Sequence, residues 1–108
     1  MVFQLGSALL DACVLSVLNK GDTYGYLLTQ NVKGIIKVSE STLYPVLRRL
    51  QKDGLLSAYD DSLNGRNRRF YTITDQGRNM LAEYAREWLE YKAILDEMLL
   101  GGNNDEQE

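Results

Sequence analysis

Residues 55–74 read LLSAYDDSLNGRNRRFYTIT, and this stretch contains the strongest fold signal in the sequence. Two segments rich in aromatic and β-branched residues, 55–61 and 68–74, flank a loop that contains Asn64-Gly65. An Asn-Gly pair is typical of the tight turn of a β-hairpin, because both residues accept positive φ angles. We therefore predict a β-hairpin with an arginine-rich loop.

Two helices are predicted near the start of the chain. Residues 5–19 form a helix that is apolar on more than one side, so it either lies at the centre of the domain or meets another subunit. A second helix is predicted over 24–34, with Asp22 or Thr23 as its N-cap. The segment 35–38 after it is predicted to be a short extended bridge.

The third predicted helix, SESTLYPVLRRLQKDG at 39–54, has the clearest pattern. Ser39 or Ser41 is a suitable N-cap, and Gly54 ends the helix. Pro45 is tolerated because it falls near the first turn. One buried stripe follows from the helical spacing of four residues: Leu43, Val46, Leu47 and Leu50.

A long last helix is predicted over about 75–99, capped by Thr74 or Asp75 and followed by a frayed tail at 101–108. Apolar residues alternate along it at spacings of three and four, as in a heptad seam. The seam residues are Leu81, Tyr84, Trp88, Tyr91, Leu95 and Met98. A helix of this length spans ~37 Å at ~1.5 Å per residue, more than so small a domain can cover. We therefore expect a second copy to cover the seam.

Composition argues against catalysis. The 108 residues include no histidine and one cysteine, so the commonest general base and a thiolate metal cluster are both missing. We interpret Cys13 as a core residue, and we expect no enzyme activity, no cofactor and no metal. No apolar run has the ~18 residues that a membrane span needs. The first residues lack the basic start of a signal peptide, so a cytoplasmic location is expected.

The net charge of −3 is unevenly distributed. Residues 1–78 contain ten Lys/Arg and seven Asp/Glu, a balance of +3, whereas residues 79–108 contain two and eight, a balance of −6. The acidity therefore belongs to the last helix and tail, and the rest of the chain is basic.

Basic and small polar residues gather on the third helix and in the hairpin loop, a combination typical of DNA recognition. Alternation along the strand predicts that Arg68 and Arg69 point to opposite faces, and we expect phosphate to face the arginines of the loop. The alternatives are a solvated helix face and a solubilising turn. The candidate DNA-binding residues are Lys37, Ser41, Thr42, Tyr44, Arg48, Arg49, Asn64, Arg66, Arg68 and Arg69.

The order of three helices and a hairpin predicts a mainly α fold with a small β-hairpin, the winged helix-turn-helix. We expect this domain to span 1–74 and the last helix, 75–100, to be a dimerisation helix in the same compact unit. A dimer of this kind suits palindromic DNA.

Three segments together resemble the PadR-like transcriptional regulators: KGDTYGYLL at 20–28, TLYPVLRRLQKDGLL at 42–56 and GRNRRFYTITDQGRNML at 65–81. The resemblance implies a dimeric repressor with residues 41–52 as recognition helix and 64–69 as wing. A single helix after the wing is like the compact branch of the family.

Within that branch the chain is most similar to the lactococcal-type multidrug-binding repressors, which stack planar drugs against a tryptophan eleven residues after a glycine. Gly77 and Trp88 have that spacing. Those proteins have an acid where this chain has Lys92, so Asp11, Glu87 or Glu90 would have to substitute, or the ligand is neutral or anionic. The candidate ligand-binding residues are Asp11, Ala12, Leu15, Trp88, Tyr91 and Lys92.

The function expected from these patterns is a repressor released by a small aromatic compound bound at the dimer interface. In one alternative, Trp88 is only dimer core and the regulator has no small-molecule ligand. In another, the protein is a winged-helix adaptor that binds an acidic protein partner.

Overall fold

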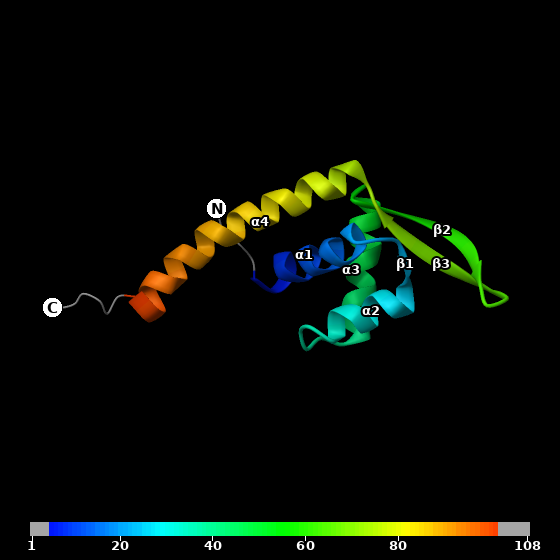
Figure 1. The fold of residues 1–108 in the computed structure, drawn as a ribbon, viewed down its shortest axis with the longest axis horizontal. Coiled ribbons are helices and arrows are strands. Elements are labelled where there is room, and N and C mark those ends of the chain that lie inside the picture. Colours follow the sequence, from blue (N-terminus) through cyan, green and yellow to red (C-terminus); the bar gives the residue numbers. More distant parts are fainter. Residues whose placement is uncertain (1–4, 102–108) are drawn as a thin grey trace.

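The structure, a computed structural model, describes residues 5–101. It is mainly helical with one small antiparallel sheet, as predicted (Figure 1). The elements in chain order are α1 (Leu5–Asn19), β1 (Thr23–Tyr24), α2 (Gly25–Lys33), α3 (Glu40–Lys52), β2 (Leu56–Leu63), β3 (Arg66–Ile73), α4 (Asp75–Asp96) and a π-helical turn (Glu97–Gly101). The rest of the predicted tail, 102–108, lies outside the described residues.

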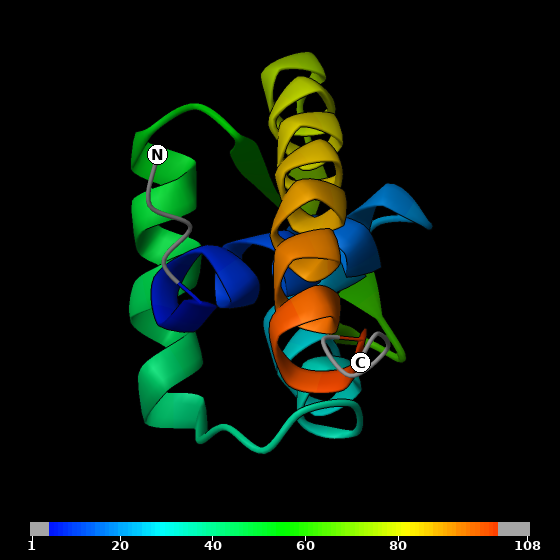
Figure 2. The same ribbon diagram turned by 90° about the vertical axis from the view of Figure 1, so that its left-hand side faces the viewer.

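Helix α1 is the centre of the molecule. It contacts α2, α3, α4 and β3, and Figure 2 shows it crossing between α3 and α4. The central placement expected for a helix that is apolar on several sides is therefore the one observed. Twelve buried apolar residues form the core: Val14, Leu15, Leu18, Leu28, Val32, Leu43, Val46, Leu47, Leu50, Leu56, Tyr71 and Ile73.

The predicted hairpin is confirmed, but its strands are longer than expected. Strands β2 and β3 pair from Leu56 opposite Ile73 to Leu63 opposite Arg66. Only Asn64 and Gly65 form the turn, with φ angles of 55° and 75°. The prediction of a six-residue loop was wrong because four of its residues pair across the hairpin, Ser62 with Asn67 and Leu63 with Arg66. The arginines therefore stand on a strand, whose alternation decides where each side chain points.

The third strand, β1, was missed. Thr23 pairs with Tyr71 and Tyr24 with Phe70, so the strand order is β1-β3-β2. The N-cap of α2 is accordingly Tyr24, without a side-chain hydrogen bond, and the prediction of Asp22 or Thr23 was wrong. Two residues are too few for a periodic signal, and the pairing depends on a strand about 50 residues away.

Helix α3 has Ser39 as its N-cap, and Gly54 follows it with a φ of 80°. All four residues of the predicted stripe are buried. Pro45 is the sixth residue of the helix, beyond the first turn, so the carbonyl of Ser41 receives no helical bond from it. Ser41 is exposed to water, which reduces the penalty. Residues 35–38 form a turn and irregular chain instead of an extended bridge.

Helix α4 begins at the predicted cap, where the Thr74 hydroxyl accepts a hydrogen bond from the Gly77 N–H at 3.0 Å. Its first half packs on the core through Leu81 and Tyr84. Its second half extends away from the domain, opposite to the hairpin (Figure 1). Three helices, a hairpin wing and a long final helix make up the predicted winged helix-turn-helix arrangement.

Gly77 lies in the first turn of α4, just after β3, and is packed too closely there for a side chain. A Cβ atom there would lie 2.2 Å from the backbone oxygen of Leu55 and 2.7 Å from Ile73 Cγ1. We expect Gly77→Ala to lower the free energy of unfolding by about 1–3 kcal/mol, as overpacking does. Urea denaturation would measure this loss. Gly34→Ala, whose new Cβ would meet only ordinary contacts at 3.5 Å, is the control and should change stability less.

Candidate nucleic-acid interface and ligand cavity

One side of α3 is exposed and polar. Its buried stripe faces α1 and β2, so the residues on the opposite side of the helix are left to solvent. Tyr44 is half-buried at the edge of this side and packs against the core. We name the exposed group the recognition face: Ser41, Thr42, Pro45 and Arg48. Lys37 is exposed in the turn before the helix.

The beginning of α3 is held by side-chain hydrogen bonds. The Ser39 hydroxyl lies 2.9 Å from that of Ser41 and 3.0 Å from that of Thr42. The nearby acid, Glu40, accepts a hydrogen bond from Gln30 at 3.0 Å and pairs with Lys33 at 3.5 Å. Its negative charge is thus partly balanced beside the recognition face.

The wing arginines have three different environments. Arg69 is exposed, and its Nε lies 3.7 Å from Oδ1 of Asp60 directly across the hairpin. Arg68 is half-buried, with its guanidinium carbon 4.6 Å from the centroid of the Tyr24 ring. The prediction that the two point to opposite faces is confirmed. Arg66 stands at the tip, opposite Leu63.

The acids of the hairpin lie directly across from its arginines. The register places Asp60 opposite Arg69 and Asp61 opposite Arg68. The hairpin 56–73 therefore has three positive and two negative charges, a balance of +1. Asn64, another predicted DNA-binding residue, is the first residue of the turn.

Arg49 lies at the edge of the recognition face, seven residues after Thr42, but its guanidinium is bonded to another helix. Its Nη1 and Nη2 donate to the carboxylate of Asp11 at 3.1 Å and 2.5 Å, and the hydroxyl of Tyr84 donates to the same carboxylate at 3.1 Å. Sequence reasoning assigned Arg49 to DNA and Asp11 to a ligand, and missed that they bind each other. Two features of the sequence could have indicated the pair: Asp11 is an acid inside an apolar helix, and Arg49 lies beside the buried stripe of α3.

This contact changes the ionisation of its members. The hydrogen bond to Asp11 raises the pKa of Arg49 above its usual value. Burial, followed by the charge of Asp11, raises the pKa of Tyr84 to about 12. Both groups therefore keep their protons at neutral pH, and both donate to the carboxylate.

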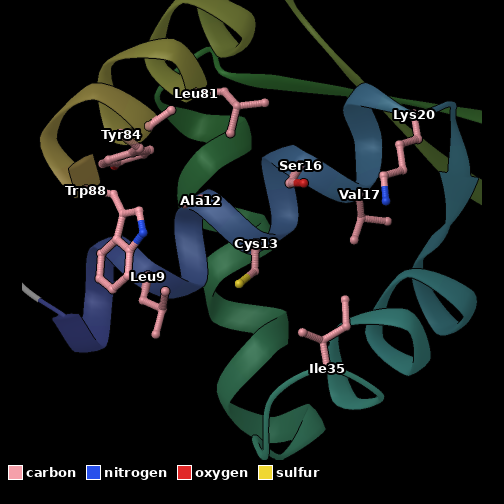
Figure 3. A pocket seen from close by; sticks show the side chains of 11 residues that line it. Leu9, Ala12, Cys13, Ser16, Val17, Lys20, Ile35, Leu81, Tyr84 and Trp88 are labelled. Atoms are coloured by element: carbon pink, nitrogen blue, oxygen red, sulfur yellow. The ribbon is translucent and has the colours of Figure 1, made fainter. Parts of the chain in front are cut away.

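An apolar hollow of about 350 Å³ lies between α1, the first half of α4 and the turn after α2 (Figure 3). Lys20 is the one charged residue among those that line it. Leu9, Ala12, Cys13, Ser16, Val17, Lys20, Ile35, Leu81, Tyr84, Ala85 and Trp88 form its walls. Burial raises the pKa of the Cys13 thiol, so that side chain is neutral in the wall.

The hollow brings together only part of the predicted ligand set. Ala12 and Trp88 line it, whereas Asp11 and Leu15 are buried in the protein, at 4% and 0% exposure. The Tyr91 ring is near Trp88, with a centroid separation of 6.5 Å. Lys92 forms an ion pair with Asp96 at 2.8 Å.

Within residues 5–101, no group of three His, Cys, Asp or Glu side chains is arranged to hold a metal ion. No helix in that range is both long enough and apolar enough to cross a membrane.

The family model described as the transcriptional regulator PadR-like family matches residues 14–83, from the end of α1 to the middle of α4. The chain belongs to this family. This PadR-like protein is 42% identical over 66 residues to a transcriptional regulator of Mycobacterium tuberculosis. The aligned residues make up 60% of this chain and 62% of the relative.

Solved structures of other proteins agree with the fold. A crystal structure from Streptococcus mutans UA159 has 34% identity and a TM-score of 0.84, with all of both chains covered. Bacillus subtilis PadR in complex with operator DNA has 26% identity and a TM-score of 0.64, over 71% of this chain and 46% of that one.

The raised pKa of Tyr84 predicts a pH dependence of stability. The tyrosine pKa is about 10 in an unfolded chain and about 12 here, so its contribution is complete below about pH 10 and is lost as the pH rises towards 12. Urea midpoints of wild type and Tyr84→Phe would measure this contribution. We expect wild type to be the more stable at neutral pH and the difference to narrow above about pH 10. A constant difference would contradict it.

Proposed function

We propose that this PadR-like chain binds operator DNA, with α3 in the major groove and the wing against the phosphate backbone. The observation that carries the proposal is the recognition face, an exposed polar side of α3 with Arg48 beyond two hydroxyl groups. Hydroxyls and arginine both bond base edges and phosphates. The operator complex of Bacillus subtilis PadR, which shares this fold, supports the same use here.

The proposal includes a homodimer formed by α4. Leu81 and Tyr84, the first two residues of the predicted seam, pack within their own protomer, so a partner would meet the later part of the seam. Trp88 and Met98 of that part are exposed and Tyr91 and Leu95 are half-buried. Apolar neighbours outside the seam are exposed as well: Leu89, Ile94, Leu99 and Leu100. Their burial against a second copy would remove the largest apolar surface of the helix from water. Two recognition helices would then read half-sites ~34 Å apart.

A small aromatic effector is the third part of the proposal. The hollow has a tryptophan and a tyrosine in its walls and an ammonium group from Lys20. A flat ring packs well against such walls, and the lysine favours a carboxylate. Since Asp11 is already paired, the compound we propose is neutral or anionic and releases the DNA when it binds.

Salt dependence tests the DNA-binding part. For about six phosphate contacts, log affinity for the protein's own promoter DNA should fall against log salt with a slope near −5. Arg66→Ala should make the slope shallower by about 2, because each protomer of the dimer loses one contact. Gel retardation over a salt series would measure both slopes.

Arg86→Ala is the matched control, since Arg86 lies on α4 and pairs with Glu83 and Glu90. It should leave the slope unchanged. DNA binding that is absent or insensitive to salt would contradict the proposal. If the protein then captured an acidic protein instead of DNA, the adaptor function would be favoured.

Trp88 fluorescence tests the effector. It is the chain's single tryptophan, so the signal has one source. We expect 1-naphthoate to quench it and to weaken DNA binding, and the matched cation 1-naphthylmethylammonium to do so less. Lys20→Gln should weaken naphthoate binding by about tenfold, the loss of one charge-assisted contact. If neither compound changes the fluorescence, Trp88 belongs to the dimer core alone.

A further inference from the structure

The carboxylate of Asp11 is the most deeply buried charge among the described residues. Asp11 is 4% exposed in the middle of α1, yet its partners come from two other helices, Arg49 of α3 and Tyr84 of α4. A buried carboxylate needs such partners because its transfer out of water is costly. Its three hydrogen bonds therefore hold α3 and α4 in one relative position.

Tyr84 connects this contact to the hollow. Its ring forms part of the wall, next to Trp88 one helical turn further along α4 (Figure 3). Its hydroxyl donates a hydrogen bond to Asp11. A movement of α4 or of a wall side chain that shifts the Tyr84 ring therefore pulls on the hydrogen bond to Asp11. No other residue in the wall donates to that carboxylate in the described structure.

Arg49 connects the same contact to the recognition face. It follows Arg48 directly in α3, and the pair of bonds from its guanidinium to Asp11 fixes both the position and the rotation of that part of the helix. Arg48 and Arg49 are consecutive and lie about 100° apart around the helix, so a rotation of α3 about its axis would move both of them. The orientation of the recognition face thus depends on a carboxylate that belongs to α1.

We propose that Asp11 is a positioning residue that transmits the position of Tyr84, in the wall of the hollow, to Arg49 on the recognition helix. This inference rests on the proposed function, since its consequence is an effect on DNA binding. Asp11 and Tyr84 need not touch DNA. They set the angle between α3 and α4, and in a dimer held by α4 that angle sets the distance and rotation between the two recognition faces.

Tyr84→Phe is the variant that tests the relay, because it removes the hydroxyl group and keeps the ring in the wall. Tyr26→Phe makes the same change on α2, where the side chain is exposed and belongs to none of the proposed sites, and is the control. The wild-type protein first selects an operator from random DNA. Dissociation constants are then measured for that operator and for versions with one base pair added or removed between the half-sites, at a temperature where circular dichroism shows every variant folded.

We expect Tyr84→Phe to weaken binding to the selected operator by about threefold to tenfold and to reduce the discrimination against altered spacing by a similar factor. A role in stability alone would lower the unfolding midpoint and leave both quantities unchanged in the folded protein. Tyr26→Phe should retain wild-type discrimination.

A double-mutant cycle adds a second measurement. Arg49→Lys keeps the charge and loses the two-pronged contact, so it should also relax spacing discrimination. If the relay acts as a unit, Tyr84→Phe added to Arg49→Lys should have little further effect. Fully additive effects on DNA affinity would argue against it.

The outcomes separate the two proposals. A wild-type protein that selects no DNA overturns the proposed function and the relay with it. A wild-type protein that binds its operator, with Tyr84→Phe and Tyr26→Phe indistinguishable from it in affinity and spacing discrimination, overturns the relay alone.

Discussion

A helix that is apolar on several sides is stable in water only when it is covered on several sides, and α1 imposes that requirement on the whole molecule. Helices α2 and α3, strand β3 and the first half of α4 each contact it. Leu15 at its centre has no exposed surface. With one side of α1 covered by its own chain, the second half of α4 keeps several exposed apolar residues that a partner could cover.

The same enclosure explains why Asp11 is unusual. A carboxylate within such a helix has no route to solvent, so the elements that cover it must supply hydrogen-bond donors. The donors come from residues 38 and 73 positions further along the chain. The elements that cover α1 therefore also supply the hydrogen-bond donors that its buried carboxylate needs.

Much of this fold could be predicted from local patterns. The stripe of α3, the Ser39 cap, the Asn64-Gly65 turn and the heptad spacing of α4 depend on residues close to one another in sequence. The remaining features of the fold depend on contacts between segments that are far apart in the sequence. Strand β1 exists because β3 offers it hydrogen bonds, and nothing in Thr23-Tyr24 alone indicates a strand.

The candidate site shows the same division. Exposure of Ser41, Thr42 and Arg48 follows from the helical period, so their place on one face could be predicted. The partner of Arg49 could not, because a helical wheel shows which side a residue occupies and not which element lies beside it. Likewise, the acids opposite Arg68 and Arg69 were visible in sequence, but only the register shows that they face each other.

That register has a consequence for how the protein would search a genome. Nonspecific affinity for DNA grows with the number of phosphates that a protein neutralises. A wing that holds its own counter-charges, with Asp60 3.7 Å from Arg69, presents little net charge to a passing duplex. Its residence on random sequence is correspondingly short, and a stable complex must then depend on contacts that discriminate between bases. By partly neutralising its wing, the chain gives up overall grip and gains a faster search among competing sites.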